Sequence, residues 1–186
     1  MDHQEYEQCK VELLNALTDR SHPWRIVSFS NVSLKGEPVN RFVVLRDVKG
    51  HDLVFFTDIR SNKIEAIVQR PMISLCFYHP DKEIQLQIKA KATLHHQDDV
   101  TLREWEEMSA GSRVCYHMVE EPGEVLDEPF FLKPDSMTIE EAYEYFGVVH
   151  CRSVEWEILK LNRSGNQRTR IKIDEKGGEV IDHLAP

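Results

Sequence analysis

The segment from Thr57 to Lys63, with the sequence TDIRSNK, combines residue types that suit the binding of a phosphate or another small anion. It joins a predicted strand to a predicted helix, where Ser61 is a plausible N-cap and Lys63 lies in the first turn. Backbone N–H groups at a helix start carry partial positive charge, to which the hydroxyls and the lysine add donors. Arg41 and Arg46 flank a neighbouring strand and could reach the same anion. The alternative is an ordinary capped surface helix with a solvated lysine.

The sequence offers less for metal or haem chemistry. His95 and His96 are adjacent, so on a strand their side chains point to opposite faces and cannot easily share one metal. The four cysteines are widely spaced without a C-x-x-C pair, which predicts reduced thiols and no metal site. They are Cys9, Cys76, Cys115 and Cys151. No nucleophile-elbow, P-loop or dinucleotide-binding motif occurs in the sequence, so catalytic residues are not predicted.

Composition narrows the class of protein. The 186 residues fit a single domain over 1–186, and a hydrophobic content of 41% is enough to form a core. A net charge of −9 disfavours nucleic-acid binding, because phosphate backbones require clustered basic residues. No apolar run approaches the roughly 20 residues of a membrane span, and the polar N-terminus lacks the features of a secretory signal. We therefore expect a cytoplasmic protein whose ligand is a small molecule.

Hydrophobic periodicity predicts short strands joined by tight turns, with helices outside them. Residues 83–94 alternate most clearly, with Ile84, Leu86 and Ile88 opposite Gln85. Strands are predicted at 25–32, 41–48, 53–57, 72–78, 83–94, 153–161 and 169–173. Helices are predicted at 4–19, 61–69, 97–110 and from Thr138 through Phe146, with a long loop at 111–135. The hairpin-length connections favour an antiparallel β-barrel with peripheral helices over a parallel α/β sheet.

Four motifs, in this order, resemble the pyridoxamine 5′-phosphate oxidase-like family of FMN-binding split-barrel proteins. They are R-F-V-V-L-R from Arg41, F-F-T-D-I-R-S-N-K ending at Lys63, C-F-Y-H-P from Cys76 and Q-L-Q-I-K-A from Gln85. The resemblance extends over about residues 20–115 and more loosely over the C-terminal strands. The chain resembles the oxidase-related group of this family more closely than the vitamin B6 enzyme itself. It implies a homodimer with FMN in a cleft between the subunits.

The resemblance also implies which residues contact FMN. The predicted contacts are Arg41, Phe42, Val43, Val44, Leu45, Arg46, Phe56, Thr57, Ser61, Asn62, Lys63, Gln85 and Arg170. Among these, Ser61 and Lys63 would hold the phosphate, and Gln85 would approach the isoalloxazine ring. The family commonly has an arginine where this chain has Asn62, a loss for which Arg60 or Arg41 could compensate.

Other departures from the family affect the substrate side. Of the family residues that hold the substrate phosphate, the serine is retained as Ser112, but Met108 replaces an arginine. Near the C-terminus, Asn166 replaces an arginine and Arg168, a weak candidate for substrate contact, replaces a histidine. We therefore predict an FMN-dependent oxidoreductase whose substrate is unknown and is not pyridoxamine 5′-phosphate. A non-catalytic flavin-binding protein and, less favoured, a haem-binding split barrel remain as alternatives.

Overall fold

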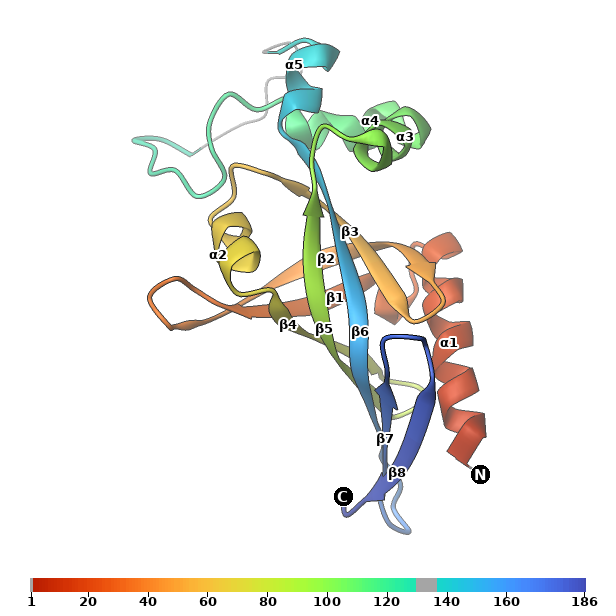
Figure 1. The fold of residues 1–186 in the computed structure, drawn as a ribbon. Coiled ribbons are helices and arrows are strands. Elements are labelled where there is room, and N and C mark those ends of the chain that lie inside the picture. Colours follow the sequence, from red (N-terminus) through yellow and green to blue (C-terminus); the bar gives the residue numbers. More distant parts are fainter. Residues whose placement is uncertain (1, 130–136) are drawn as a thin grey trace.

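The computed structural model describes residues 2–129 and 137–186, whose strands form one eight-stranded antiparallel sheet. The strand order is β3-β2-β1-β4-β5-β6-β7-β8, and β3 also pairs with β6. This second pairing closes β1 to β6 into a barrel, from which β7 and β8 continue the sheet beyond β6 (Figure 1). The predicted antiparallel barrel with peripheral helices is confirmed.

The strands are β1 (Ile26–Val32), β2 (Pro38–Lys49), β3 (Asp52–Asp58), β4 (Met72–His79), β5 (Ile84–His95), β6 (Phe146–Lys160), β7 (Gln167–Ile173) and β8 (Glu179–Leu184). The α-helices are α1 (Asp2–Thr18), α2 (Lys63–Gln69), α3 (Asp99–Glu107), α4 (Ala110–Arg113) and α5 (Ile139–Glu144). Two 3-10 turns are η1 (Pro23–Arg25) and η2 (Val114–Tyr116). No helix within the described ranges is long and apolar enough to cross a membrane.

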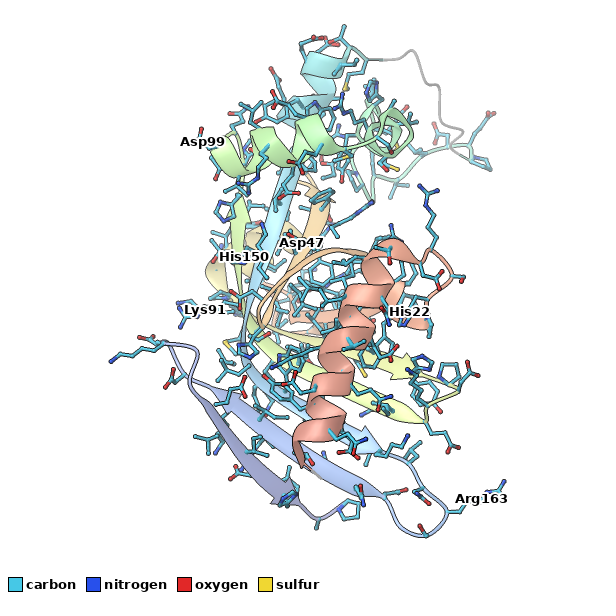
Figure 2. All side chains as sticks on the ribbon, turned by 90° about the vertical axis from the view of Figure 1, so that its right-hand side faces the viewer. His22, Asp47, Lys91, Asp99, His150 and Arg163 are labelled. Carbon is cyan, nitrogen blue, oxygen red and sulfur yellow. The ribbon has the colours of Figure 1, made fainter. Side chains whose placement is uncertain are left out.

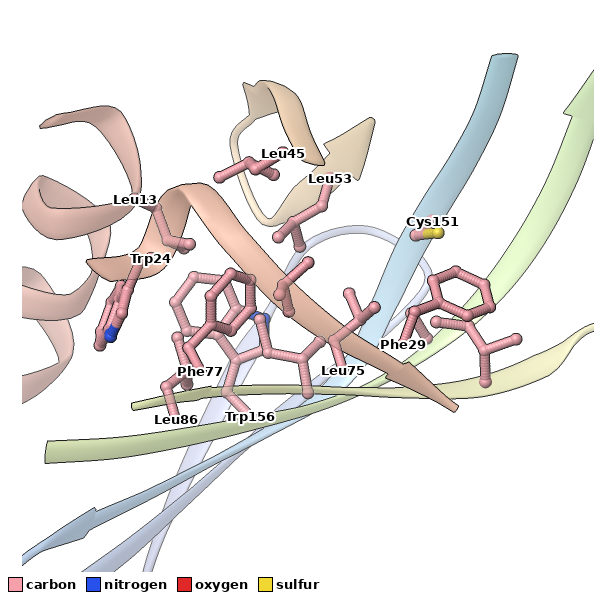
Figure 3. Close-up of a cluster of buried hydrophobic side chains, with 14 of the residues drawn as sticks. Leu13, Trp24, Phe29, Leu45, Leu53, Leu75, Phe77, Leu86, Cys151 and Trp156 are labelled. Atoms are coloured by element: carbon pink, nitrogen blue, oxygen red, sulfur yellow. The ribbon is translucent and has the colours of Figure 1, made fainter. Parts of the chain in front are cut away.

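The barrel interior is filled by large apolar side chains. On β5 the predicted alternation holds, because Ile84, Leu86 and Ile88 are fully buried while the residues between them face outward. Trp24, which follows α1, and Trp156 on β6 are also fully buried in this core, which Figure 3 shows. Helix α1 adds its buried face to the same cluster.

A second apolar cluster, which we call the outer core, lies between the outer face of β3 and β6 and the helices that follow β5. Its buried members are Val54, Trp105, Met108, Tyr116, Ala142, Phe146 and Val148. This cluster explains why strand β6 begins at Phe146, earlier than the predicted residue 153. Residues 146–149 are buried on both faces of the sheet, so they lack the alternation by which the rest of the strand is recognised.

The helix boundaries also differ from those predicted. The helix predicted through Phe146 ends at Glu144, because Phe146 pairs with Asp58 of β3 as the first residue of β6. The predicted helix at 97–110 is the shorter α3, which Asp98 caps. The predicted loop at 111–135 contains most of α4 and the turn η2 in its first part, while residues 130–135 lie outside the described residues.

Candidate anion-binding site

The junction between β3 and α2 carries the lysine that the sequence singled out. Ile64 and Ile67 of α2 are buried in the barrel core, which fixes the helix against the sheet. The predicted N-cap is one residue too early, because Asn62 occupies that position in an already helical conformation and its side chain makes no capping bond. The Ser61 hydroxyl instead accepts a hydrogen bond from Lys63 Nζ, at 2.9 Å. The Ser61 hydroxyl and the Lys63 ammonium group are therefore next to each other at the start of α2.

Lys63 is held in an environment that disfavours its own charge. Burial and the nearby positive charge of Arg41 lower the pKa of Lys63 from 10.5 to about 8, and Asp58 opposes this only in part. Burial also lowers the pKa of Arg41. Neither residue forms a salt bridge within the described part of the chain. Two partly buried cations without a carboxylate partner create a local positive potential that an anion would neutralise.

Contacts inside the barrel hold Arg41 in place. Its Nη1 donates to Asn31 Oδ1 and, at 3.4 Å, to the carbonyl oxygen of Phe29. Its guanidinium carbon also lies 5.6 Å from the centre of the Phe29 ring. Asn31 is buried on the neighbouring strand β1. The guanidinium is therefore fixed by neutral partners, which leave its charge uncompensated.

Arg60, one of the two arginines that could replace the missing family arginine, is already engaged. Its guanidinium binds the Asp58 carboxylate, with a shortest distance of 2.6 Å. It also donates to the carbonyl oxygens of Met118 and Val119 and stacks 3.7 Å from the centre of the Tyr145 ring. These contacts fasten the segment after η2 to the end of β3. Because Arg60 is engaged in these contacts, Arg41 on β2 is the arginine that could compensate for the missing family arginine.

Arg46 is a third partly buried cation, on the outer side of β2. A β-bulge between Leu45 and Asp47 interrupts the pairing with β3 at this residue. The guanidinium lies 5.2 Å from the centre of the Phe56 ring, and its Nε is buried without a hydrogen-bond partner among the described residues. Burial lowers the pKa of Arg46. An orphaned donor of this kind costs free energy unless a ligand satisfies it.

The other predicted contacts on β2 and β3 divide between the two faces of the barrel wall. Val43 and Leu45 face the core, whereas Phe42 and Val44 face outward. Thr57 is buried and its hydroxyl donates to the carbonyl oxygen of the next residue. Val43 and Leu45 therefore cannot line a ligand on the outer face of the barrel, whereas Phe42 and Val44 can, because successive residues of a strand point to opposite faces.

The remaining predicted contacts lie elsewhere on the sheet. Gln85 is the second residue of β5 and faces outward, and Arg168 and Arg170 lie on β7. Figure 1 shows β7 and β8 extending below the barrel, away from α2 at its left side. Arg168 pairs with Glu157 at 2.5 Å and Arg170 pairs with Asp182 at 2.6 Å. Within a single chain, Gln85, Arg168 and Arg170 therefore lie apart from the lysine on α2.

The residues expected on the substrate side make contacts within the chain. Met108 is buried in the outer core with Trp105 and Tyr116. Ser112, in α4, accepts a hydrogen bond from the Ser109 hydroxyl at 3.0 Å. Met108 therefore packs as a core residue, which an arginine at this position could not do.

Sequence reasoning missed one cluster of titratable side chains, which lies between α1 and the turn from β4 to β5. Glu12 is buried and accepts hydrogen bonds from Lys82 and, at 3.0 Å, from His22, while His79 Nε2 lies 3.8 Å away. The carboxylate and the two imidazoles are close enough to hold a metal ion. However, His22 Nδ1 accepts the Trp24 backbone N–H, so its proton sits on Nε2, the nitrogen that a metal would need. The cluster is an ionic clamp on α1.

This clamp predicts a loss of stability in acid. Burial raises the pKa of Glu12, but the hydrogen bonds from Lys82 and His22 outweigh it and set the pKa below 4.5. Burial lowers the pKa of His79 below 6.5. Protonation of either group thus favours the unfolded chain, so the free energy of unfolding falls below pH 6.5 and again below pH 4.5.

At pH 7 we expect Glu12→Gln to cost about 1–3 kcal/mol in a urea titration, because it leaves the partners of the carboxylate uncompensated. Glu7→Gln on the same helix is the matched control, because the Glu7 side chain is 61% exposed and, among the described residues, forms a salt bridge with Lys10 alone. It should change stability by less than about 0.5 kcal/mol. Equal effects of the two substitutions at pH 7 would contradict the clamp.

The geometry defines a split barrel with a partly buried, unpaired cationic cluster at the start of α2. Comparison with known families adds that residues 7–96 match the pyridoxamine 5′-phosphate oxidase, FMN-binding domain. The predicted family resemblance is confirmed for this part of the chain, which is just under half of its length.

Curated relatives align with just under half of the chain. The pyridoxine/pyridoxamine 5′-phosphate oxidase of Haemophilus influenzae (strain 86-028NP) is 32% identical over 88 residues, which are 47% of this chain and 40% of that protein. The enzyme of the same name from Teredinibacter turnerae is 35% identical over 86 residues, or 46% of this chain and 41% of that protein. The chain thus matches less than half the length of these relatives.

Solved structures extend the likeness of the fold to almost the whole chain. A pyridoxamine 5′-phosphate oxidase-related, FMN-binding protein from Nostoc punctiforme superposes with a TM-score of 0.78 at 21% identity, covering 97% of both chains. PhzG from Burkholderia lata, in complex with tetrahydrophenazine-1-carboxylic acid, gives 0.75 at 14% identity, covering 98% of this chain and 92% of that one. At these identities the similarity shows a shared fold.

Proposed function

We propose that this chain binds FMN and that Arg41, Ser61 and Lys63 hold its phosphate. The observation that carries the proposal is the pair of partly buried cations without a carboxylate partner in the described ranges, with a serine hydroxyl between the strand and the helix. A phosphate would supply the missing negative charge and accept hydrogen bonds from all three side chains. The match of this part of the chain to an FMN-binding domain supports the same ligand.

The outward face of β2 and its neighbours supports a second element of the proposal, a homodimer. Phe42 is 74% exposed, and further apolar side chains surround it on the same face of β1, β2 and β4. These are Ile26, Val44, Met72 and Tyr78. A monomer rarely leaves such a face in water, and a second copy would cover it. Gln85 and Arg170, distant from Lys63 in one chain, would then reach an FMN held by the partner.

The reaction we propose is a flavin-dependent oxidation or reduction. When bound, FMN supplies the redox chemistry, while the protein binds and orients it. The buried Nε of Arg46 gives the site an additional donor for the cofactor. The substrate differs from pyridoxamine 5′-phosphate, because Met108 is buried away from any ligand and Arg168 already holds Glu157.

Absorption spectroscopy tests this function. Protein mixed with FMN and freed of excess ligand should keep the two visible bands of an oxidised flavin. Anaerobic addition of pyridoxamine 5′-phosphate should leave these bands almost unchanged, whereas dithionite should bleach them and so prove that the bound flavin can be reduced. Protein that retains no FMN would overturn the cofactor assignment. Rapid bleaching by pyridoxamine 5′-phosphate would instead overturn only the substrate assignment.

A further inference from the structure

A short segment of the chain passes beside the start of α2, next to the site proposed for the FMN phosphate. We call residues 118–124 the strap, which follows the buried Tyr116 of η2. A Cβ atom added to Gly123 would lie 3.7 Å from the side-chain nitrogen of Asn62, the residue that precedes α2. Two views place this loop at the end of the barrel where α3 to α5 lie, away from β7 and β8 (Figure 1 and Figure 2).

The tip of the strap is a preformed turn. The backbone N–H of Glu124 donates to the carbonyl oxygen of Glu121 at 3.0 Å, and the N–H of Glu121 donates to Glu124 Oε2 at the same distance. Pro122 and Gly123 occupy the central positions, and Gly123 has a φ of +94°, as in a type II turn. These bonds lie within the tip, so the strap can move as a unit without losing its turn.

Little apolar burial holds the strap in place. Val119 is 61% exposed, and Val125, just beyond the strap, is 95% exposed. The strap also contains three glutamates, at positions 120, 121 and 124. A segment with few buried apolar contacts opens locally at a low free energy. The closed position of the strap must therefore depend on polar contacts.

Arg60 supplies these polar contacts. Its Nη2 and Nη1 atoms donate to the carbonyl oxygens of Met118 and Val119, at 3.0 and 3.1 Å. Asp58 holds the same guanidinium, and the side chains of Arg60 and Asp58 are only 10% and 9% exposed. Hydrogen bonding to Asp58 raises the pKa of Arg60, and the charge of Glu121 adds to this effect, so the guanidinium keeps its charge. Hydrogen bonds from a charged donor are about twice as strong as neutral ones, so two of them are an effective latch.

We propose that Arg60 is a positioning residue that latches the strap beside the phosphate site, and that FMN enters and leaves when this latch opens. The proposal rests on the assignment of the FMN phosphate to Arg41, Ser61 and Lys63. The cations of that site and the glutamates of the strap have opposite charges, which favours the closed strap in the apoprotein. A gate that must open for both entry and exit changes both rates and leaves the affinity nearly unchanged.

Stopped-flow fluorescence of FMN binding and release tests the latch in the variant Arg60→Lys. A lysine keeps the ion pair with Asp58, so the variant should fold, but its single nitrogen cannot also bind both strap carbonyls. Association and dissociation should both become about tenfold faster, the equivalent of one hydrogen bond with a charged group, while Kd changes less than about threefold. Arg70→Lys is the matched control, because Arg70 follows the other end of α2 and donates to the carbonyl oxygens of Ser33 and Leu34. It should leave both rates unchanged.

A second variant, Asp58→Asn with Arg60→Gln, removes the latch charge together with its buried counter-charge and should speed both rates at least as much. In the apoprotein, a glutamate-specific protease should cut Arg60→Lys after Glu120 or Glu124 about tenfold faster than the wild type, because cleavage follows the open population. FMN rates equal to the wild type in both variants, equal cleavage of the apoproteins, or faster release with unchanged association would overturn the latch. Wild-type protein that binds no FMN would instead overturn the cofactor assignment, and cleavage of the apoprotein would still decide whether Arg60 holds the strap.

Discussion

A Lys63→Met variant is expected to bind FMN roughly 10- to 150-fold more weakly than the wild-type protein, the range that corresponds to one hydrogen bond with a charged group. The same substitution should stabilise the protein without FMN, by up to about 3 kcal/mol. The pKa of Lys63 falls from 10.5 to about 8 on folding, so at pH 7 the charge on this lysine lowers the free energy of unfolding. Methionine fills a similar volume without a charge.

Fluorescence titration of FMN and urea unfolding of the apoprotein measure the two effects. In the wild type, FMN affinity should fall as the pH rises above 8, because Lys63 loses its proton there, and the variant should lack this step. Lys91→Met is the matched control, an exposed lysine on β5 at which we expect no change in either quantity. Unaltered FMN affinity in Lys63→Met would remove this residue from the phosphate site.

The second large effect is expected for Phe42→Glu, which should convert the proposed dimer into a monomer. Phe42 stands at the centre of the apolar outward face, where a carboxylate would have to be buried without a partner. FMN affinity should fall with dimerisation, since Gln85 and Arg170 of one chain could no longer reach the flavin of the other. The stability of the single chain should change by less than about 0.5 kcal/mol, because the side chain is exposed in the monomer.

Light scattering coupled to size exclusion reports the mass of each variant, and FMN titration reports the site. Leu14→Glu on α1 provides the control, because Leu14 is also exposed but lies on a helix outside the apolar face. It should remain dimeric and bind FMN normally. A wild-type protein that is already monomeric at micromolar concentration, or a dimeric Phe42→Glu variant, would contradict the interface.

Local patterns in the sequence were sufficient for the barrel and for the lysine of the site. The strict alternation of β5 specifies a wall with one buried and one outward face, because side chains on a strand repeat every two residues. The same kind of local signal located Lys63 just after β3, at the start of a helix. The first part of β6 escaped prediction because the outer core covers its second face, and no local pattern encodes a partner that packs from a distant helix.

By itself, then, the sequence determined most of the strands, the family resemblance and the position of Lys63 at the start of a helix, since each depends on neighbours along the chain. Only the tertiary structure decided which of the two arginines stays available to it. Arg60 is bound to Asp58 and to two backbone carbonyls, whereas Arg41 on β2 is close enough to lower the pKa of Lys63 and forms no salt bridge with any described residue. It also decided that His79 lies 3.8 Å from the Glu12 carboxylate. Such contacts join residues far apart in the chain, and their energies depend on burial, which arises only when the barrel closes.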